Sequence, residues 1–279
     1  MSTPQSLDWH RVSVIARTDL RQLRQAKDFW VPMTILGSIF FLIIPGILLL
    51  IITNMGDVAA VERMAATLEI LPESAQAQIR GETPSARAGY ALAVFLLAPV
   101  AIVVPLTIST AVAASTIVGE RERGTGEFLA HSPAATREIY LGKLIASAIP
   151  GYLTTIVGFG GYSILVNLTV GPEVGGWFFP TTQWWLLVVW VVPPFIALAL
   201  SLVLRLSARV TSTAAAQQAS GLVTLPLIMI AYSQSTGALF GSASLTLAIG
   251  AIAWVIAGAS LIRGMGSLSR GRLLGVGME

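Results

Sequence analysis

Two long stretches without a charged side chain, residues 88–118 and 144–170, constrain this chain more than any other feature of its sequence. Each is longer than the ~20 apolar residues with which an α-helix crosses the hydrocarbon core of a bilayer. Charged residues make up 11% of the whole chain, whereas soluble domains contain about 25%. We therefore expect an all-α, polytopic membrane protein.

Six apolar segments are long enough to be membrane spans, and they form one transmembrane domain over residues 1–279. The segments are residues 30–53, 89–118, 144–170, 184–204, 211–233 and 244–262. Several contain prolines, which predict kinks that neighbouring helices must cover. The second segment is longer than a bilayer requires, so we expect it to be kinked or tilted, or to extend beyond the membrane. Residues 54–88 are expected to form an external loop with one or two short helices.

The positive charges predict the orientation of the spans. With six spans both chain ends lie on one side, and that side holds all but three of the 17 lysines and arginines. The three exceptions lie in the 54–88 loop. Because Arg and Lys accumulate in cytoplasmic loops, both termini and residues 119–143 are expected to be cytoplasmic in a multi-pass protein of the cytoplasmic membrane.

Residues 8–28 are predicted to form an amphipathic helix before the first span. Its apolar side chains recur at spacings of three and four, and they are Trp9, Val12, Ala16, Leu20 and Leu23. A neighbouring face carries His10, Arg17, Arg21 and Arg24. Such a helix can lie along the lipid headgroups with its apolar stripe at the acyl boundary. The alternative is a solvated helix in the cytosol.

Several classes of function are disfavoured by what the sequence lacks. The chain has no cysteine and two histidines, and neither histidine lies in a span, so no thiolate or histidine metal site and no Ser/His hydrolase site can be assembled. None of the six segments contains a charged residue, which counts against proton-coupled carriers and voltage sensors. No basic block indicates a nucleic-acid partner. Aromatic side chains at residues 177–185 are expected to be interfacial anchors.

The chain also lacks a phosphate-binding loop, which requires G-x-x-x-x-G-K-[ST]. Its one Gly-Lys pair is Gly142-Lys143, where Arg137 occupies the first glycine position and Leu144 follows the lysine. We therefore expect no enzymatic activity and no bound cofactor in this chain. ATP and magnesium are expected in a separate subunit. The sequence does not indicate which span residues line a cargo path.

Residues 119–143 combine four acidic and four basic side chains between the two uncharged stretches. Gly119 and Gly124 predict the end of the second helix, and Thr136 is expected to cap the third, with Glu138 in its first turn. Residues 126–131 are expected to form a short helix across the membrane face. An apolar tip with a charged rim suits a groove in another protein, although an ordinary solvated loop has the same composition.

The order of residues in this segment resembles a known family. Glu-Arg-Glu-Arg-Gly-Thr-Gly-Glu-Phe-Leu-Ala-His-Ser-Pro at 120–133, followed by Arg137-Glu138 and Gly142-Lys143, is similar to the signature of type-2 ATP-binding-cassette (ABC) permeases. That signature reads roughly E-R-E-x-G-T-x-E-x-L-x-x-x-P and then E-x-x-x-G-K. The layout of six spans behind an amphipathic helix extends the resemblance over nearly the whole chain. Ala130-His131 departs from many relatives and leaves the partner's identity open.

The resemblance implies a role for each part of the segment. The loop between spans two and three would hold a coupling helix that docks in an ATPase subunit, and residues 8–28 would form a connecting helix beside it. The implied coupling residues are Glu120, Arg121, Glu122, Gly124, Thr125, Glu127, Phe128, Leu129, Pro133, Glu138, Gly142 and Lys143. The implied connecting-helix residues are Trp9, Val12, Arg17, Arg21 and Arg24.

The resemblance also implies partners and a direction of transport. Two ATPase subunits and a second permease copy, or a paralogue, would complete the transporter, and export is more frequent than import in such families. Uncharged spans favour a hydrophobic or amphipathic cargo such as a drug, peptide or lipid. The alternatives are export of sodium or of polysaccharide or lipid-linked cargo, a stand-alone carrier or channel, and a membrane assembly factor without cargo.

Overall fold

The computed structural model describes residues 7–54, 61, 68, 73–122, 124, 127–128, 131–207, 210, 212–235 and 243–267. Within these residues all regular secondary structure is helical, and the expectation of an all-α chain is confirmed for them. The elements are α1 (Trp9–Gln25), α2 (Lys27–Ser38), η1 (Ile39–Ile43), α3 (Ile44–Asn54), α5 (Glu73–Gln76), α6 (Pro84–Ala91), η2 (Leu92–Leu96), α7 (Val100–Glu122), α9 (Thr136–Thr169), η3 (Gly171–Glu173), α10 (Thr182–Trp185), η4 (Leu186–Val191), α11 (Val192–Ser207), α12 (Thr213–Ser235) and α13 (Ala243–Ser267).

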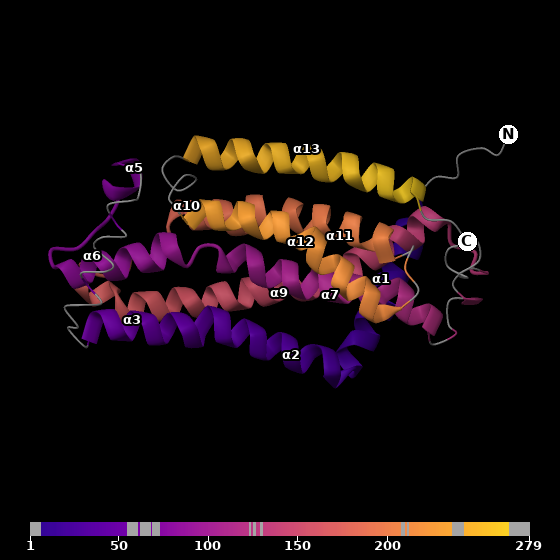
Figure 1. The fold of residues 1–279 in the computed structure, drawn as a ribbon, viewed down its shortest axis with the longest axis horizontal. Coiled ribbons are helices and arrows are strands. Elements are labelled where there is room, and N and C mark those ends of the chain that lie inside the picture. The colour runs from indigo at the N-terminus through magenta and orange to yellow at the C-terminus, as the bar shows by residue number, and fades with distance from the viewer. Residues whose placement is uncertain are drawn as a thin grey trace.

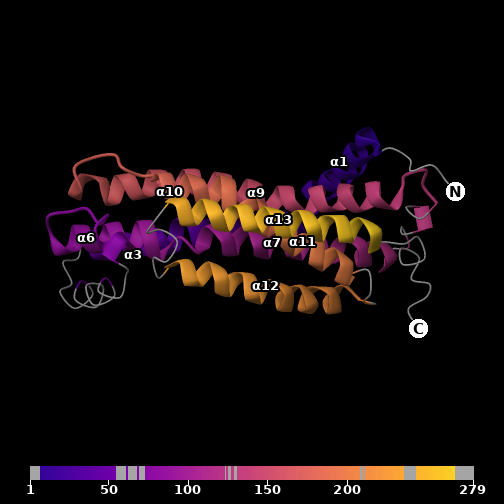
Figure 2. The ribbon, with the colours of Figure 1, turned by 90° about the horizontal axis from the view of Figure 1, so that it is seen from above.

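The long helices lie side by side along one axis (Figures 1 and 2). We call the end at which α7 stops and α9 starts the joint end, and α1 lies there too. The opposite end, here the far end, holds α5, α6 and α10. Helix α7 is central, because it packs against α9, α11 and α12.

Five continuous helices among the described residues are long and apolar enough to cross a membrane. They are Lys27–Thr53, Pro84–Glu120, Thr136–Thr169, Thr182–Ser207 and Ala243–Gly266. They coincide with the first, second, third, fourth and sixth expected spans. The fifth expected span corresponds to α12, which is not among the five, so the count of six stays a prediction.

The second span helix starts earlier than the expected residue 89. The side chain of Thr83 caps it, because the Thr83 Oγ1 accepts a hydrogen bond from the Ala86 N–H at 3.1 Å, and Pro84 at the first helical position has no N–H to satisfy. The helix therefore includes residues that we had assigned to the external loop. Of the external loop expected at residues 54–88, residues 55–60, 62–67 and 69–72 lie outside the described residues.

Three spans contain a π-helical stretch shortly before a proline. The stretches η1, η2 and η4 precede Pro45, Pro99 and Pro193 respectively. Proline has no N–H to donate and its ring collides with the carbonyl of the preceding turn, so the helix widens or breaks there. After η2 the helix is interrupted by a turn at residues 97–99. The predicted kinks of the first, second and fourth spans thus take the form of wide turns.

Aromatic side chains satisfy the backbone that the break at η2 leaves open. The Tyr162 hydroxyl donates to the Ala93 carbonyl oxygen at 2.7 Å, and the Trp184 Nε1–H donates to the Val94 carbonyl oxygen at 2.9 Å. Both aromatic side chains are buried. The expectation of an interfacial anchor is therefore wrong for Trp184, whereas Trp177 is exposed.

Gly151 brings α9 into close contact with α7. A Cβ atom at this position would lie 2.6 Å from the Pro105 carbonyl oxygen and closer still to the Ser109 Oγ. Because a backbone carbonyl has little room to shift, any larger residue must push the two helices apart.

We expect Gly151→Ala to lower the free energy of unfolding by about 1–3 kcal/mol, the usual cost of overpacking a core. Thermal unfolding of the purified chain in detergent measures the effect. Gly160→Ala is the matched control on the same helix, because nothing lies within 4 Å of its Cβ position. Equal stability of the two variants would contradict the close approach of α7 and α9.

Candidate functional site

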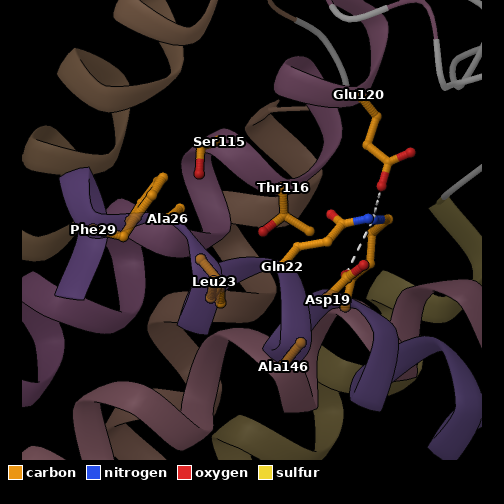
Figure 3. A pocket seen from close by; sticks show the side chains of 10 residues that line it. Asp19, Gln22, Leu23, Ala26, Phe29, Ser115, Thr116, Glu120 and Ala146 are labelled. Atoms are coloured by element: carbon orange, nitrogen blue, oxygen red, sulfur yellow. Dashed lines mark hydrogen bonds and ion pairs between the residues drawn. The ribbon is translucent and has the colours of Figure 1, made fainter.

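The side chain of Lys143 links α1, α7 and α9 at the joint end. It lies on α9 and is 1% exposed. Its Nζ is 2.9 Å from the Glu120 Oε1 on α7 and 3.2 Å from the Asp19 Oδ2 on α1. Figure 3 shows the carboxylates of Asp19 and Glu120 directed at the same amine. A buried charge is tolerated only when it is paired. The ammonium group on α9 therefore requires the carboxylates on α1 and α7.

Gly142 lets α1 approach α9 closely enough for this contact. A Cβ atom at Gly142 would lie 2.7 Å from the Ile15 Cγ2 and 3.2 Å from the Val12 carbonyl oxygen. Val12 and Ala16 are buried on the same face of α1. We call Asp19, Glu120, Gly142 and Lys143 the joint: the glycine admits α1 and the lysine holds it.

A second contact ties the start of α1 to the start of α9. Glu138 is 2% exposed, and its carboxylate accepts the N–H of Ala135 at 2.8 Å and the N–H of Asp8 at 3.0 Å. The Arg11 Nη1 donates to the Pro133 carbonyl oxygen at 2.8 Å and lies 3.8 Å from the Glu138 Oε2. The loop before α9 is thereby held to α1.

The expected N-cap of this helix is wrong by one residue. Thr136 is the first residue of α9, and the cap position belongs to Ala135. Alanine has no side-chain acceptor, and Glu138 reaches back to the open backbone N–H instead. The first-turn carboxylate, which we expected to act through the helix dipole, therefore also makes a direct hydrogen bond.

The second helix ends where Gly119 and Gly124 predicted. Helix α7 continues through Gly119 to Glu122, and Gly124 lies in the turn that follows. The last turn carries Glu120, which is held by Lys143. This ion pair stabilises the last turn of α7 in the helical conformation. Arg121 lies in α7, and the structure does not describe its side chain.

The side chain of Glu122 hydrogen-bonds to the first residue of α12. Its carboxylate accepts the Thr213 N–H at 2.8 Å and also the Thr213 hydroxyl. A carboxylate at a helix N-terminus satisfies an open N–H and interacts favourably with the helix dipole. Glu122 thus connects α7 to α12 across the joint end.

We expect Glu122→Ala to speed hydrogen–deuterium exchange in the first turn of α12 by about fivefold, which corresponds to the ~1 kcal/mol typical of a lost cap. Exchange in α13 should not change. Glu127→Ala is the control, because Glu127 is also an exposed glutamate of the same segment. Faster exchange in both variants would indicate a general effect of charge and would contradict the cap.

The remaining predicted coupling residues fall into an exposed group and a group outside the described residues. Gly124, Glu127, Phe128 and Pro133 are exposed, and the Phe128 side chain is 80% exposed. Gly124 adopts φ +73°, a left-handed conformation that favours glycine. We call Glu127 and Phe128 the tip. Thr125 and Leu129 lie outside the described residues, so the expected short helix at 126–131 stays a prediction.

The predicted connecting-helix residues of α1 differ in exposure. Val12 is buried, Trp9 is exposed, and Arg17, Arg21 and Arg24 are exposed. The helix ends at Gln25 instead of residue 28, because Ala26 interrupts it before α2. Val12 and Ala16 of the apolar stripe are buried where α1 packs on α9, so these two side chains do not face acyl chains.

Sequence reasoning missed three residues that connect α1 to its neighbours at the joint end, namely Asp19 and Arg11 in α1 and its N-cap Asp8. The available signal was Asp19 itself, an acidic residue three positions after Ala16 and four before Leu23, in the middle of the apolar stripe. Its partner Lys143 is 124 positions away in the sequence, and that distance hid the pairing.

A small pocket of about 70 Å³ lies beside Lys143 (Figure 3). Its other lining residues are Asp19, Gln22, Leu23, Ala26, Phe29, Ser115, Thr116, Glu120 and Ala146. Sites for drug-sized ligands have volumes of roughly 300–1,000 Å³, so this pocket has room for a few water molecules and not for such a cargo. Among the described residues no group of three or more His, Cys, Asp and Glu could hold a metal ion.

Comparison with known proteins places the chain in a family. A family model described as "ABC-2 family transporter protein" matches residues 13–252. A comparison with curated proteins finds no match. The family match includes α1 from Ser13 onward, the joint and the segment between α7 and α9. The chain belongs to the ABC-2 family of transporter proteins and is a membrane permease subunit of an ABC transporter, a class that works with ABC ATPase partners.

Proposed function

We propose that this permease exports a hydrophobic or amphipathic cargo, such as a drug, peptide or lipid, and that it takes its energy from two separate ATPase subunits. The exposed Phe128 carries this proposal. A large apolar side chain that is 80% exposed and follows the exposed Glu127 has the properties of an anchor at the centre of a protein–protein interface. In the proposed complex it inserts into a groove of the ATPase.

The joint explains how a movement at the tip would reach the spans. Lys143 lies at the start of a long span helix, and its two partners lie on α7 and α1. A displacement of the segment between α7 and α9 therefore moves three helices together. Because the ion pairs are buried, they are little screened by solvent and keep their geometry during the movement.

The other parts of the proposal concern the assembly. A second permease copy or a paralogue faces this one, and ATP and magnesium bind in the ATPase subunits. The bias of arginine and lysine supports cytoplasmic termini in the cytoplasmic membrane. The six uncharged segments of the sequence support an apolar cargo, because a charge at the centre of a span costs roughly 2.5–3.5 kcal/mol and is kept where a charged substrate needs it.

Transport into inside-out vesicles tests the proposal. The permease is reconstituted with its co-expressed ATPase, and uptake of a hydrophobic cationic dye and of a fluorescent phospholipid is followed after addition of ATP and magnesium. We expect uptake of at least one of these probes with the ATPase and none with the permease alone. Equal uptake by the permease alone would contradict the proposed source of energy. Dependence on ATP for sodium and for neither probe would contradict the proposed cargo.

A further inference from the structure

The outward face of α1 carries three arginines without a partner among the described residues. Arg17, Arg21 and Arg24 follow one another at spacings of four and three, so they lie on one face of the helix. We call them the arginine stripe. All three are exposed, and no described residue forms an ion pair or hydrogen bond with their side chains. The remaining arginine of α1, Arg11, instead bonds the Pro133 carbonyl oxygen.

Asp19 of α1 and the N-cap residue Asp8 contact other groups and do not neutralise the stripe. Asp19 contacts Lys143 on the inner face, and Asp8 caps the helix and pairs with Arg11 at 3.3 Å. Val12 and Ala16 are buried against the bundle, which fixes the rotation of α1. The stripe therefore points away from α9 and cannot turn inward without breaking the joint.

The position of α1 places the stripe beside the membrane surface. Ala26 alone separates α1 from α2, and the first apolar helix begins at Lys27. Lys27 and Trp30 are both exposed, and a lysine followed by a tryptophan at the end of a span is typical of the headgroup level. Figure 2 shows α1 standing out from the side of α9 at the joint end. Arg24 is thus within one helical turn of the first residue of the span.

We propose that the arginine stripe binds the phosphate groups of anionic phospholipids in the leaflet at the joint end. A guanidinium group matches a phosphate through paired N–H donors and is less strongly hydrated than an ammonium group. Helix α1 is then held from two sides, by Asp19 and Lys143 towards the bundle and by lipid on the outside. Anionic lipid stabilises the position of α1 that closes the joint. The inference depends on the membrane position of the chain and not on the proposed ATPase contact.

A carboxylate-rich surface of the ATPase is the competing partner for the same arginines. Lipid is favoured because the stripe adjoins the first residue of a span, whereas the tip, with its exposed aromatic side chain, belongs to the segment between α7 and α9. The two partners predict different losses when the stripe is neutralised. Removing a lipid site lowers lipid binding, and removing a protein contact lowers ATPase binding alone.

The test uses the purified full-length chain in a neutral detergent, titrated with phosphatidylglycerol or phosphatidylcholine, with bound lipid counted by native mass spectrometry. Each arginine near an anionic lipid surface contributes about 1 kcal/mol of binding free energy. Neutralising two of them therefore lowers the affinity roughly thirtyfold. We therefore expect Arg21→Gln/Arg24→Gln to bind phosphatidylglycerol about thirtyfold more weakly and phosphatidylcholine unchanged. The matched control is Arg80→Gln/Arg87→Gln, which changes an exposed arginine in α6 and another just before that helix, and it should stay within twofold of the unaltered chain.

Both variants replace exposed side chains, so both should unfold at the same temperature as the unaltered chain. Unchanged phosphatidylglycerol binding by Arg21→Gln/Arg24→Gln would overturn the proposal. An equal loss in the two variants would overturn it as well, because the effect would follow net charge and not the stripe. Loss of ATPase binding with lipid binding retained would assign the stripe to the ATPase and would likewise overturn it.

Discussion

Replacing Lys143 by methionine should lower the free energy of unfolding by about 3–5 kcal/mol, the range measured when one member of a buried ion pair is removed. The variant leaves the carboxylates of Asp19 and Glu120, which are 13% and 15% exposed, without the cation that lies between them. Thermal or denaturant unfolding of the purified chain in detergent measures the loss. In the complete transporter we expect ATP hydrolysis to continue while transport falls, because the joint no longer carries the movement.

Two comparisons separate the joint from a general loss of charge. Arg137→Met removes a positive charge from the first turn of the same helix, at a half-buried side chain, and should cost less than about 1 kcal/mol, as for a surface substitution. Neutralising all three joint side chains, Asp19→Asn/Glu120→Gln/Lys143→Met, should restore most of the stability, because the two carboxylates that lost the Lys143 cation are then neutral as well. A stability of Lys143→Met equal to that of Arg137→Met would contradict the joint.

Replacing Phe128 by aspartate should weaken binding of the ATPase by about thirtyfold or more, since aromatic anchors at the centre of interfaces contribute about 2 kcal/mol or more. The side chain has few contacts within the chain, so the unfolding temperature should not change. Binding is measured by titrating the purified ATPase onto the permease in lipid nanodiscs.

The control for this variant is Trp177→Asp, which changes another exposed aromatic residue at the far end of the bundle. It should leave ATPase binding unaffected. Undiminished binding by Phe128→Asp would exclude the tip as the anchor, whereas a parallel loss in both variants would indicate damage to the membrane domain. Lys143→Met and Phe128→Asp thus differ in outcome: the first changes stability and coupling, and the second changes docking.

The spans could be predicted because their signal is local. A long apolar stretch without charge, such as residues 144–170, is stable in a bilayer as a helix, because a helix satisfies all of its own backbone hydrogen bonds. The start of the second span at Pro84 escaped this reasoning, because the capping Thr83 lies in a polar segment that we read as a loop. Pro45, Pro99 and Pro193 marked three irregular stretches, whereas Pro105 and Pro150 lie inside continuous α-helices. The π-helical form of η1, η2 and η4 depends on packing that no single segment contains.

The position of the candidate site could be predicted from the sequence, but the contacts within it could not. The family resemblance implied that Glu120, Glu138 and Lys143 take part in coupling, which stays a prediction. In the folded chain Glu138 and Lys143 are buried and Glu120 is 15% exposed. Each contacts a group that is distant in the sequence, as Lys143 contacts Asp19. Only contacts between α1, α7 and α9 reveal this, and periodicity within one helix does not contain them.

Spin-label distances at the far end measure most directly whether an external ATPase moves this membrane domain. The chain contains no cysteine, so Trp177→Cys provides a single labelling position in each permease copy of the reconstituted transporter. We expect the distance between the two labels to shift on addition of ATP and magnesium when the ATPase is present, and to shift far less in Lys143→Met. A shift of the same size in the permease without the ATPase, or no shift during ATP turnover, would contradict the proposal that the tip and the joint transmit the energy of hydrolysis.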